Sequence, residues 1–282
     1  PSRRFWIIMI PIIRKRYPVG TAIVAGGPGA IFWMWVVGFV AMALKYSEAC
    51  VSIAVREKKP EGGYKGGANY YLSKINKPLG FAWSIAMIYG LITAAGVHTG
   101  SVVTACESLG IPRLVATIVV CIIIALIIFG GLQALVQITE RLVPIMAAIY
   151  IIGGLAVVVL NIGNLVPAIV SIFKGAFTGT AAIGGFAGAT ISAAIRNGCA
   201  RGVYSSDAGN GQSSIAYSQS SETDPVKQGM WGIFEVFFDT IVVCTFTALV
   251  ILCTGVWQSV KRNRKAATKA APTTTFPRST NR

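Results

Sequence analysis

"TAAIGGFAGATISAAI", residues 180–195, carries no charged side chain and holds three glycines within five positions, Gly184, Gly185 and Gly188. Each glycine costs about 1 kcal/mol relative to alanine inside a helix. The segment is apolar enough for a membrane helix but weakened in its middle, and two interpretations stay open. Either the helix is interrupted there, so that backbone groups face a cavity, or Gly184 and Gly188 form a GxxxG pair that lets two helices approach closely.

The composition around this segment predicts an all-α, multi-span membrane protein. Of 282 residues, 54% are hydrophobic and 12% charged, about half the charged fraction of a soluble domain, and the mean hydropathy is +0.65. A bilayer core of about 30 Å needs roughly 20 helical residues. Long stretches free of charge meet that length, and the predicted spans lie at about 30–54, 80–105, 114–134, 142–162, 176–195 and 230–256. A soluble helical protein would need polar surface that this sequence lacks.

The net charge of +15 is distributed as in a membrane protein rather than a nucleic-acid-binding one. Almost half of the 25 basic residues lie in the first 16 and last 22 positions, and six more lie between positions 56 and 77. The positive-inside rule therefore places 56–78 in the cytoplasm. Alternation then places 106–113 and 163–175 outside, and 135–141 and the polar connection 196–229 inside.

Ionisable groups inside the spans are candidate functional residues. Glu235 lies near the predicted cytoplasmic end of its span, where a solvated carboxylate is expected. Asp239 lies one helical turn further and deeper in the span, where it either caps or pairs with a neighbouring helix or contributes to an ion site. Lys45 and Glu48 are three positions apart and are expected to neutralise each other. The single histidine, His98, excludes a site that needs two imidazoles, and six cysteines without a CxxC pair indicate reduced thiols.

Four stretches together closely resemble the sodium:alanine (amino acid:cation) symporter family: "GGPGAIFWMWVV" (26–37), "GGFAGATISAAI" (184–195), "ARGVYSSDAGNGQSSIA" (200–216) and "DTIVVCTFTALVIL" (239–252). The resemblance runs in order from about position 21 to 257. It implies part of a LeuT-type inverted-repeat core with about six full transmembrane helices. It also implies sodium-coupled uptake of alanine or glycine across the plasma membrane, with Na⁺ as coupling ion, no other cofactor and no enzymatic activity.

The resemblance also implies a site. The segment 184–190 looks like the break in the sixth core helix of the family, and "GVHTGSVV" (96–103) falls where family members carry an amide-rich stretch. The residues expected to contact a small neutral amino acid are Gly184, Gly185, Phe186, Gly188, Thr190, His98 and Ser101. His98 and Ser101 are expected to face one cavity, within a side-chain length of Phe186. Thr180 and Asp239 are the expected ion-binding residues. The partners are the amino acid, Na⁺ and the lipid bilayer, with no nucleic acid.

The alternative is a non-transporting scaffold or channel-like protein whose glycines serve helix packing. A channel shows rings of charge or repeated filter sequences, and this sequence has neither. Residues 1–20 form an atypical basic segment, 21–257 the transporter core and 258–282 a polar basic tail. Because family members have a helix where this chain reads "IIMIPIIRKRYPVG" (7–20), the chain is expected to be an incomplete or frame-shifted fragment that does not transport on its own.

Overall fold

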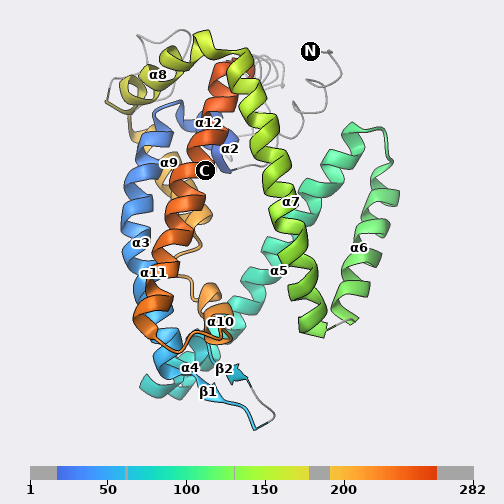
Figure 1. Cartoon of the computed structure of the whole chain (residues 1–282), viewed down its shortest axis with the longest axis vertical. Helices are drawn as coiled ribbons and strands as arrows, with labels where there is room; N and C mark the ends of the chain where they lie inside the picture. Colours follow the sequence, from blue (N-terminus) through green and yellow to red (C-terminus); the bar gives the residue numbers. More distant parts are fainter. Residues whose placement is uncertain (1–17, 61–62, 130, 178–190, 259–282) are drawn as a thin grey trace, which may run out of the picture.

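The computed structural model of the chain describes residues 18–60, 63–129, 131–177 and 191–258. Within them the regular structure is helical apart from one short β-hairpin (Figure 1). In chain order the elements are α2 (Pro18–Gly26), α3 (Ala30–Val55), β1 (Glu57–Lys58), β2 (Tyr64–Lys65), α4 (Ala68–Ile75), α5 (Lys77–Ser108), α6 (Arg113–Phe129), α7 (Gly131–Leu160), η1 (Ile162–Asn164), α8 (Leu165–Phe177), α9 (Ile191–Ser206), α10 (Gln212–Ser218), α11 (Pro225–Val236), η3 (Phe237–Val243) and α12 (Cys244–Cys253).

A break after α2 separates a short buried helix from the first long one. Gly27 has a φ of +86°, which side chains disfavour and glycine tolerates. Pro28 follows it and has no backbone N–H to donate. Glycine and proline together make "GGPGA" (26–30) a turn signal, and the chain does turn there, because α2 ends at Gly26 and α3 begins at Ala30.

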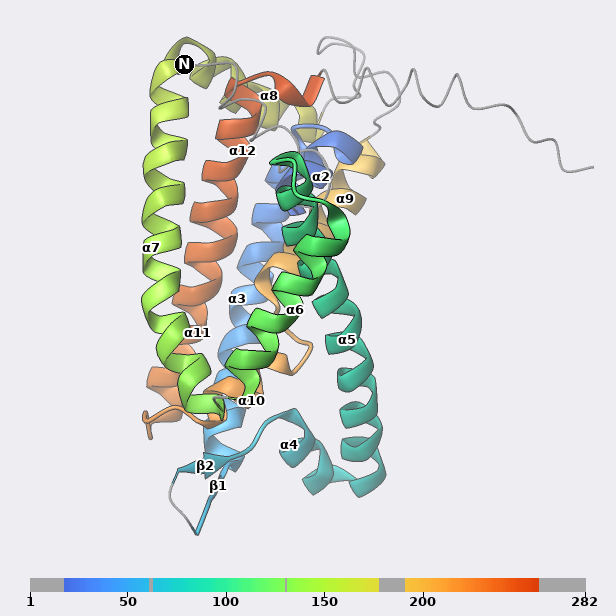
Figure 2. The same cartoon turned by 90° about the vertical axis from the view of Figure 1, so that its right-hand side faces the viewer.

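The long helices run alternately between two ends of the molecule (Figures 1 and 2). In these views α3 descends from α2 at the upper end to the antiparallel β1–β2 pair and α4 at the lower end. Then α5 rises, α6 descends and α7 rises again. The connections after α3 and α6 therefore share the lower end, as the predicted alternation requires, and this is the end that the positive-inside rule assigns to the cytoplasm.

Three predicted spans correspond to long apolar helices. α3 has 26 residues, α5 has 32, and the continuous stretch Pro225–Cys253, built from α11, η3 and α12, has 29. They match the spans predicted at 30–54, 80–105 and 230–256, and each is long enough to cross a bilayer. Only 6% of the most apolar part of α5 is buried. Apolar surface of that extent is covered by lipid or by further protein, so the chain is an integral membrane protein.

The helices in the middle of the chain differ from prediction in their boundaries. The span predicted at 114–134 crosses a helix boundary, because α6 ends at Phe129 and α7 begins at Gly131. α7 contains all but the last two residues of the span predicted at 142–162, and the chain then bends by 81° into α8. By length and composition the described residues hold three helices that could cross a membrane, or four if this bent pair is one span. The predicted total of about six stays a prediction.

The span predicted at 176–195 is divided between two helices. Its first two residues end α8 and its last five begin α9. Residues 178–190 lie outside the described part of the chain. The predicted polar connection at 196–229 is also wrong over its first third, because α9 continues to Ser206 and packs along α3.

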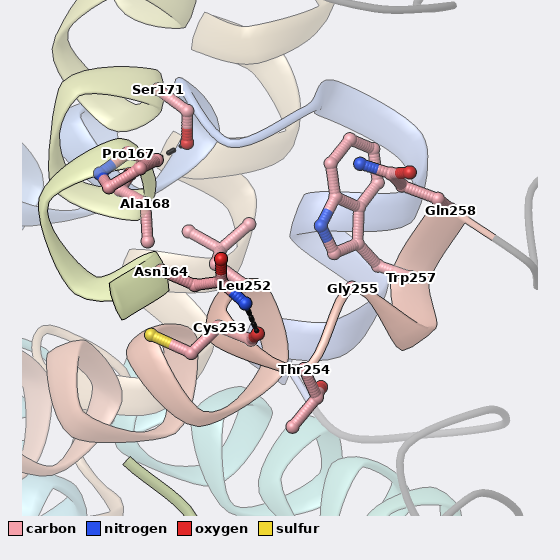
Figure 3. A pocket seen from close by; sticks show the side chains of 10 residues that line it. All are labelled: Asn164, Pro167, Ala168, Ser171, Leu252, Cys253, Thr254, Gly255, Trp257 and Gln258. Atoms are coloured by element: carbon pink, nitrogen blue, oxygen red, sulfur yellow. Dashed lines mark hydrogen bonds between the residues drawn. The ribbon is translucent and has the colours of Figure 1, made fainter. Parts of the chain in front are cut away.

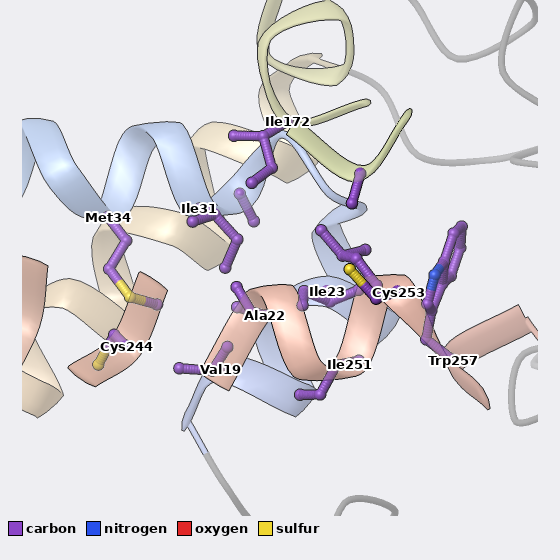
Figure 4. Close-up of a cluster of buried hydrophobic side chains, with 14 residues drawn as sticks. Val19, Ala22, Ile23, Ile31, Met34, Ile172, Cys244, Ile251, Cys253 and Trp257 are labelled. Atoms are coloured by element: carbon purple, nitrogen blue, oxygen red, sulfur yellow. The ribbon is translucent and has the colours of Figure 1, made fainter. Parts of the chain in front are cut away.

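A buried apolar cluster at the upper end joins α2, the first turns of α3, α8 and α12 (Figure 4). Its residues are Val19, Ala22, Ile23, Ala30, Ile31, Met34, Ala168, Ile172, Cys244, Ala248, Ile251, Leu252, Cys253 and Trp257. In lipid the surroundings are as apolar as these side chains, so close packing rather than the hydrophobic effect holds such a cluster together. The cluster fixes α2 inside the bundle and so positions the α2–α3 break.

Candidate functional site

The break between α2 and α3 lies against the end of α8. A Cβ added to Gly29 would lie 2.1 Å from the carbonyl carbon and oxygen of Gly175, closer than side-chain atoms allow. The indole N–H of Trp33 also donates a hydrogen bond to the carbonyl of Ala176, at 3.3 Å. The missing side chain at Gly29 therefore lets the two backbones touch.

The same break also contacts the start of α9. A Cβ on Gly26 would lie 2.9 Å from the carbonyl oxygen of Ala193. Both described flanks of the segment 178–190 are thus held at one place, the α2–α3 break. A discontinuous helix of this kind leaves backbone groups without helical partners, and such groups can bind small polar ligands.

Most of the predicted site lies in that flanked segment. Gly184, Gly185, Phe186, Gly188, Thr190 and Thr180 fall outside the described residues. The predicted interruption within 184–188 therefore stays a prediction, and so does the alternative of GxxxG packing there.

Close helix packing is present further along, on α9. Four buried residues recur at every fourth position and face α3: Ala194, Gly198, Gly202 and Ser206. A Cβ on Gly198 would lie 2.3 Å from the carbonyl oxygen of Ala30, and one on Gly202 would lie 3.1 Å from the side chain of Val37. Small residues at this spacing bring two helices into backbone contact. Sequence reasoning missed this stripe because it placed Gly198, Gly202 and Ser206 in the connection after the predicted span 176–195, although the four-residue repeat is visible.

Asp239 faces the bundle, as predicted, and contacts α9. Ser205 donates a hydrogen bond to the Asp239 Oδ2, at 2.7 Å, and the Ser205 hydroxyl also lies 3.3 Å from the Cys244 sulfur. Asp239 belongs to the π-helical segment η3, where Cys244 N–H bonds to the Asp239 carbonyl, five residues back. Such segments occur mostly as single turns inside α-helices and often at functional sites. Next to Asp239, Thr240 is fully buried and its hydroxyl has no partner among the described residues.

Glu235, one turn earlier, has different partners. Its carboxylate lies 3.5 Å from the ammonium of Lys45 and accepts a hydrogen bond from the Tyr217 hydroxyl. Its side chain is 53% exposed, which confirms the predicted solvated position. The expected Lys45–Glu48 pair is wrong: Glu48 instead accepts hydrogen bonds from α10 and the loop before it. Burial and the bond to Glu235 raise the pKa of Tyr217, so the phenol stays protonated.

His98 and Ser101 lie on α5, away from these contacts. His98 is exposed, and the Ser101 hydroxyl donates to the carbonyl of Val97 within its own helix, at 2.8 Å. Among the described residues α5 packs mainly against α4 and α6. Because Phe186 lies outside the described residues, the shared cavity stays a prediction.

A pocket of about 320 Å³ opens at the upper end, between α8 and the residues that follow α12 (Figure 3). Its polar groups are neutral, and several are already bonded. The Asn164 amide donates to the Cys253 carbonyl at 3.0 Å, and the Ser171 hydroxyl to the Ala168 carbonyl at 2.6 Å. None of the described residues that line the pocket is charged, so none of them offers a counter-charge to a zwitterion.

Comparison with known proteins gives a consistent result. A family model described as the sodium:alanine symporter family matches residues 17–281. The "Uncharacterized transporter YflA" of Bacillus subtilis is 40% identical over 258 residues, which are 90% of this chain and 55% of the relative. The "Sodium/alanine symporter AgcS" of Methanococcus maripaludis is 41% identical over 248 residues, 84% of this chain and 53% of the relative. The "Putative sodium/proton-dependent alanine carrier protein YrbD" of B. subtilis is 36% identical over 248 residues, 86% of this chain and 50% of the relative. The chain thus spans about half the length of the curated relatives it matches.

Proposed function

Because the chain belongs to the sodium:alanine symporter family, we propose that it forms the binding core of a sodium-coupled symporter for small neutral amino acids, alanine or glycine, in the plasma membrane. The single observation that carries this proposal is the family match over residues 17–281, which includes all the elements of the candidate site. AgcS is named a sodium/alanine symporter, and YrbD is named a putative sodium/proton-dependent alanine carrier protein. Both names support the substrate class.

The contacts around the α2–α3 break support a substrate site there. In this proposal the substrate lies against the segment 184–190, which belongs to the stretch 178–190 whose described flanks both meet the break. Half-helix N-termini would face the substrate carboxylate, and free carbonyls its ammonium group. In this proposal the helices form part of a LeuT-type inverted repeat, and His98 and Ser101 line the same cavity.

The coupling ion is assigned to Thr180 and Asp239. A carboxylate and a hydroxyl are hard oxygen ligands of the kind that a small cation prefers. Asp239 is half-buried and hydrogen-bonded to only one described side chain, Ser205, which leaves lone pairs of its carboxylate for another partner.

A sodium gradient supplies enough energy for this work. One Na⁺ moving through roughly 100 mV releases about 2.3 kcal/mol, and a tenfold concentration gradient adds about 1.4 kcal/mol. Together they allow an accumulation of several hundredfold. A non-transporting scaffold would not use the energy of a sodium gradient. The family to which the chain belongs disfavours that alternative.

The test is sodium-dependent binding and uptake of radiolabelled alanine. Binding is measured on the purified chain in Na⁺ and in K⁺. Uptake is measured in proteoliposomes with AgcS whose matched region is replaced by this chain, beside unmodified AgcS. We expect binding that requires Na⁺ and uptake by the chimera that follows the sodium gradient. A folded chimera that binds and transports no small neutral amino acid, while AgcS does, would contradict the proposal.

A further inference from the structure

One face of α3 carries a ladder of polar residues toward its lower end. Lys45, Glu48, Ser52 and Arg56 are spaced by three, four and four positions, which places them within one stripe of the helix. We define them as the α3 polar stripe. Each one contacts the end of α9, α10, or the chain on either side of α10.

Lys45 binds the C-terminal end of α9. Its ammonium is fully buried and donates to the carbonyls of Ser206 and Asp207, at 3.3 and 3.4 Å, and to the hydroxyl of Ser213. The C-terminus of a helix carries partial negative charge on its free carbonyls, so a cation there is favourable. Glu235 on α11 completes the charge balance at 3.5 Å.

Glu48 and Ser52 bind the first turn of α10. The Glu48 carboxylate accepts from the backbone N–H of Gly209 and from the hydroxyl of Ser214, both at 3.1 Å. The Ser52 hydroxyl donates to the carbonyl of Ser214. The carboxylate of Glu48 thus contacts hydrogen-bond donors, the N–H of Gly209 and the hydroxyl of Ser214, and the ammonium of Lys45 contacts carbonyls at the end of α9. Each charge on α3 meets groups of the opposite polarity.

Arg56 binds the chain that leaves α10. Its guanidinium donates to the carbonyls of Ser218, Ser220 and Glu222, at 3.2, 2.6 and 2.6 Å, and stacks on the ring of Tyr64 at 3.5 Å from the centroid. Hydrogen bonds with all four residues of the α3 polar stripe therefore hold α10 and the chain on either side of it.

This interface differs from the one just above it. α9 contacts α3 through Gly198 and Gly202, whose missing side chains offer no hydrogen bond to replace. The α10 interface buries the hydroxyls of Ser214 and Ser218 instead. A typical hydrogen bond contributes only about 1 kcal/mol net, because water can take its place. Water can therefore replace the hydrogen bonds that hold α10 to α3 when the two separate, whereas the close packing of α9 on α3 has no such replacement. The bonds of the charged groups are the stronger ones, about 1.5–3 kcal/mol each, so the three charged residues of the α3 polar stripe are the ones that keep α10 in place.

We propose that α10, with the loops 207–211 and 219–224, is a gate at the lower end of the molecule, latched by the Lys45–Glu235 ion pair. The latch also includes Tyr217 on α10, which donates to Glu235 and lies under the Lys45 ammonium at 5.7 Å from its ring centroid. It therefore ties three helices, α3, α10 and α11, at one point. Opening separates α10 from α3 and uncovers the lower end of α9 (Figures 1 and 2).

The backbone before α10 is suited to hinge motion. Gly209 and Gly211 both have a φ of +82°, and Asp207 has a φ of +51°. Glycines reach such angles without strain, so rotations here move α10 without disturbing the end of α9. The role of α10 as a gate for substrate release to the cytoplasm rests on the proposed function. The role of the Lys45–Glu235 pair as a latch on α10 does not.

Hydrogen–deuterium exchange of the full chain in lipid nanodiscs tests the latch. The variants are Glu235→Gln, Lys45→Met and the double variant. The matched control is the other described ion pair, Lys65–Glu57 at 3.7 Å, whose side chains are both about half exposed. It is broken in the same way by Lys65→Met and Glu57→Gln.

We expect exchange over 207–218 to rise about tenfold in Glu235→Gln, and at least as much in Lys45→Met, which also loses the bonds to Ser206, Asp207 and Ser213. The double variant should exchange no faster than Lys45→Met alone, because the ion pair is already broken there. Exchange over 191–205 and in the controls should not change. No rise over 207–218, or an equal rise over 191–205, would overturn the latch. If Lys45→Met does not fold, Glu235→Gln decides the question, because glutamine keeps the bond to Tyr217. If exchange over 207–218 rises in the latch variants but the chain shows no sodium-dependent binding or uptake, the proposed function is refuted and the latch is still supported.

Discussion

The hydroxyl of Ser205 on α9 donates a 2.7 Å hydrogen bond to the carboxylate of Asp239, which lies 34 positions later on the π-helical segment η3. This bond joins the helix that continues from the glycine-rich segment to the most deeply placed acid of the last span. It makes Asp239 the described residue through which an ion would be coupled to α9.

Asp239→Asn should remove stabilisation by sodium without unfolding the chain. The amide oxygen still accepts from Ser205, but the charge is lost, and interactions with charged groups contribute about 1.5–3 kcal/mol. We expect the sodium concentration for half-maximal thermal stabilisation to rise at least about tenfold. Ser205→Ala is the control, since it removes the bond and keeps the charge. An unchanged sodium response in Asp239→Asn would leave Asp239 a helix–helix linker only.

Gly198→Ala should destabilise the bundle. The added methyl would lie 2.3 Å from the carbonyl oxygen of Ala30, and neither backbone can move away without separating α9 from α3. Overpacking of this kind costs about 1–3 kcal/mol. The measurement is the midpoint of thermal unfolding in detergent.

Gly90→Ala on α5 is the matched control, because no atom lies within 4 Å of a Cβ there. Alanine should be neutral or slightly stabilising at this position. Equal unfolding midpoints for the two variants would show that the stripe on α9 does not set the helix contact.

Arg56→Lys should loosen the chain after α10 although it keeps the charge. Lysine cannot form the planar fork that reaches the carbonyls of Ser220 and Glu222 together, nor stack equally well on Tyr64. We expect cleavage after Glu222 by a glutamate-specific protease to quicken several-fold. Lys58→Arg, an exposed exchange on β1, should leave the cleavage rate as in the parent chain. The same rate in Arg56→Lys would mean that these bonds do not hold the loop.

His98→Asn and Ser101→Gln should change substrate preference more than stability. His98 is exposed and Ser101 bonds only within its helix, so neither holds the described fold together. A hydrogen bond gained or lost with a zwitterion changes affinity by about fivefold to tenfold. Competition of unlabelled amino acids against radiolabelled alanine measures this in the AgcS chimera. If every amino acid competes as before, both residues lie outside the substrate cavity.

The sequence by itself determined the class of molecule and several local features. Apolar stretches of about 20 residues with few or no charges predict membrane helices whatever their neighbours, and α3, α5 and the span ending at Cys253 follow that prediction. The turn at "GGPGA" also follows from local chemistry, since glycine and proline dictate their own backbone angles. The depth of Asp239 and the solvated position of Glu235 followed from their distance to the end of the span.

Only the tertiary structure decided which residues meet. Lys45 and Glu48 are neighbours on one helix, so their spacing predicted an ion pair. In the structure, Lys45 instead binds carbonyls at the end of α9, and Glu48 binds the chain before α10. The ion pair therefore forms with Glu235, 190 positions away in the chain. Likewise, α9 continues past Arg196 and Arg201 into the region predicted as a connection. It does so because its face of small residues packs against α3. Periodicity reports which face of a helix is apolar or small, whereas the partner of that face depends on contacts between segments distant in sequence.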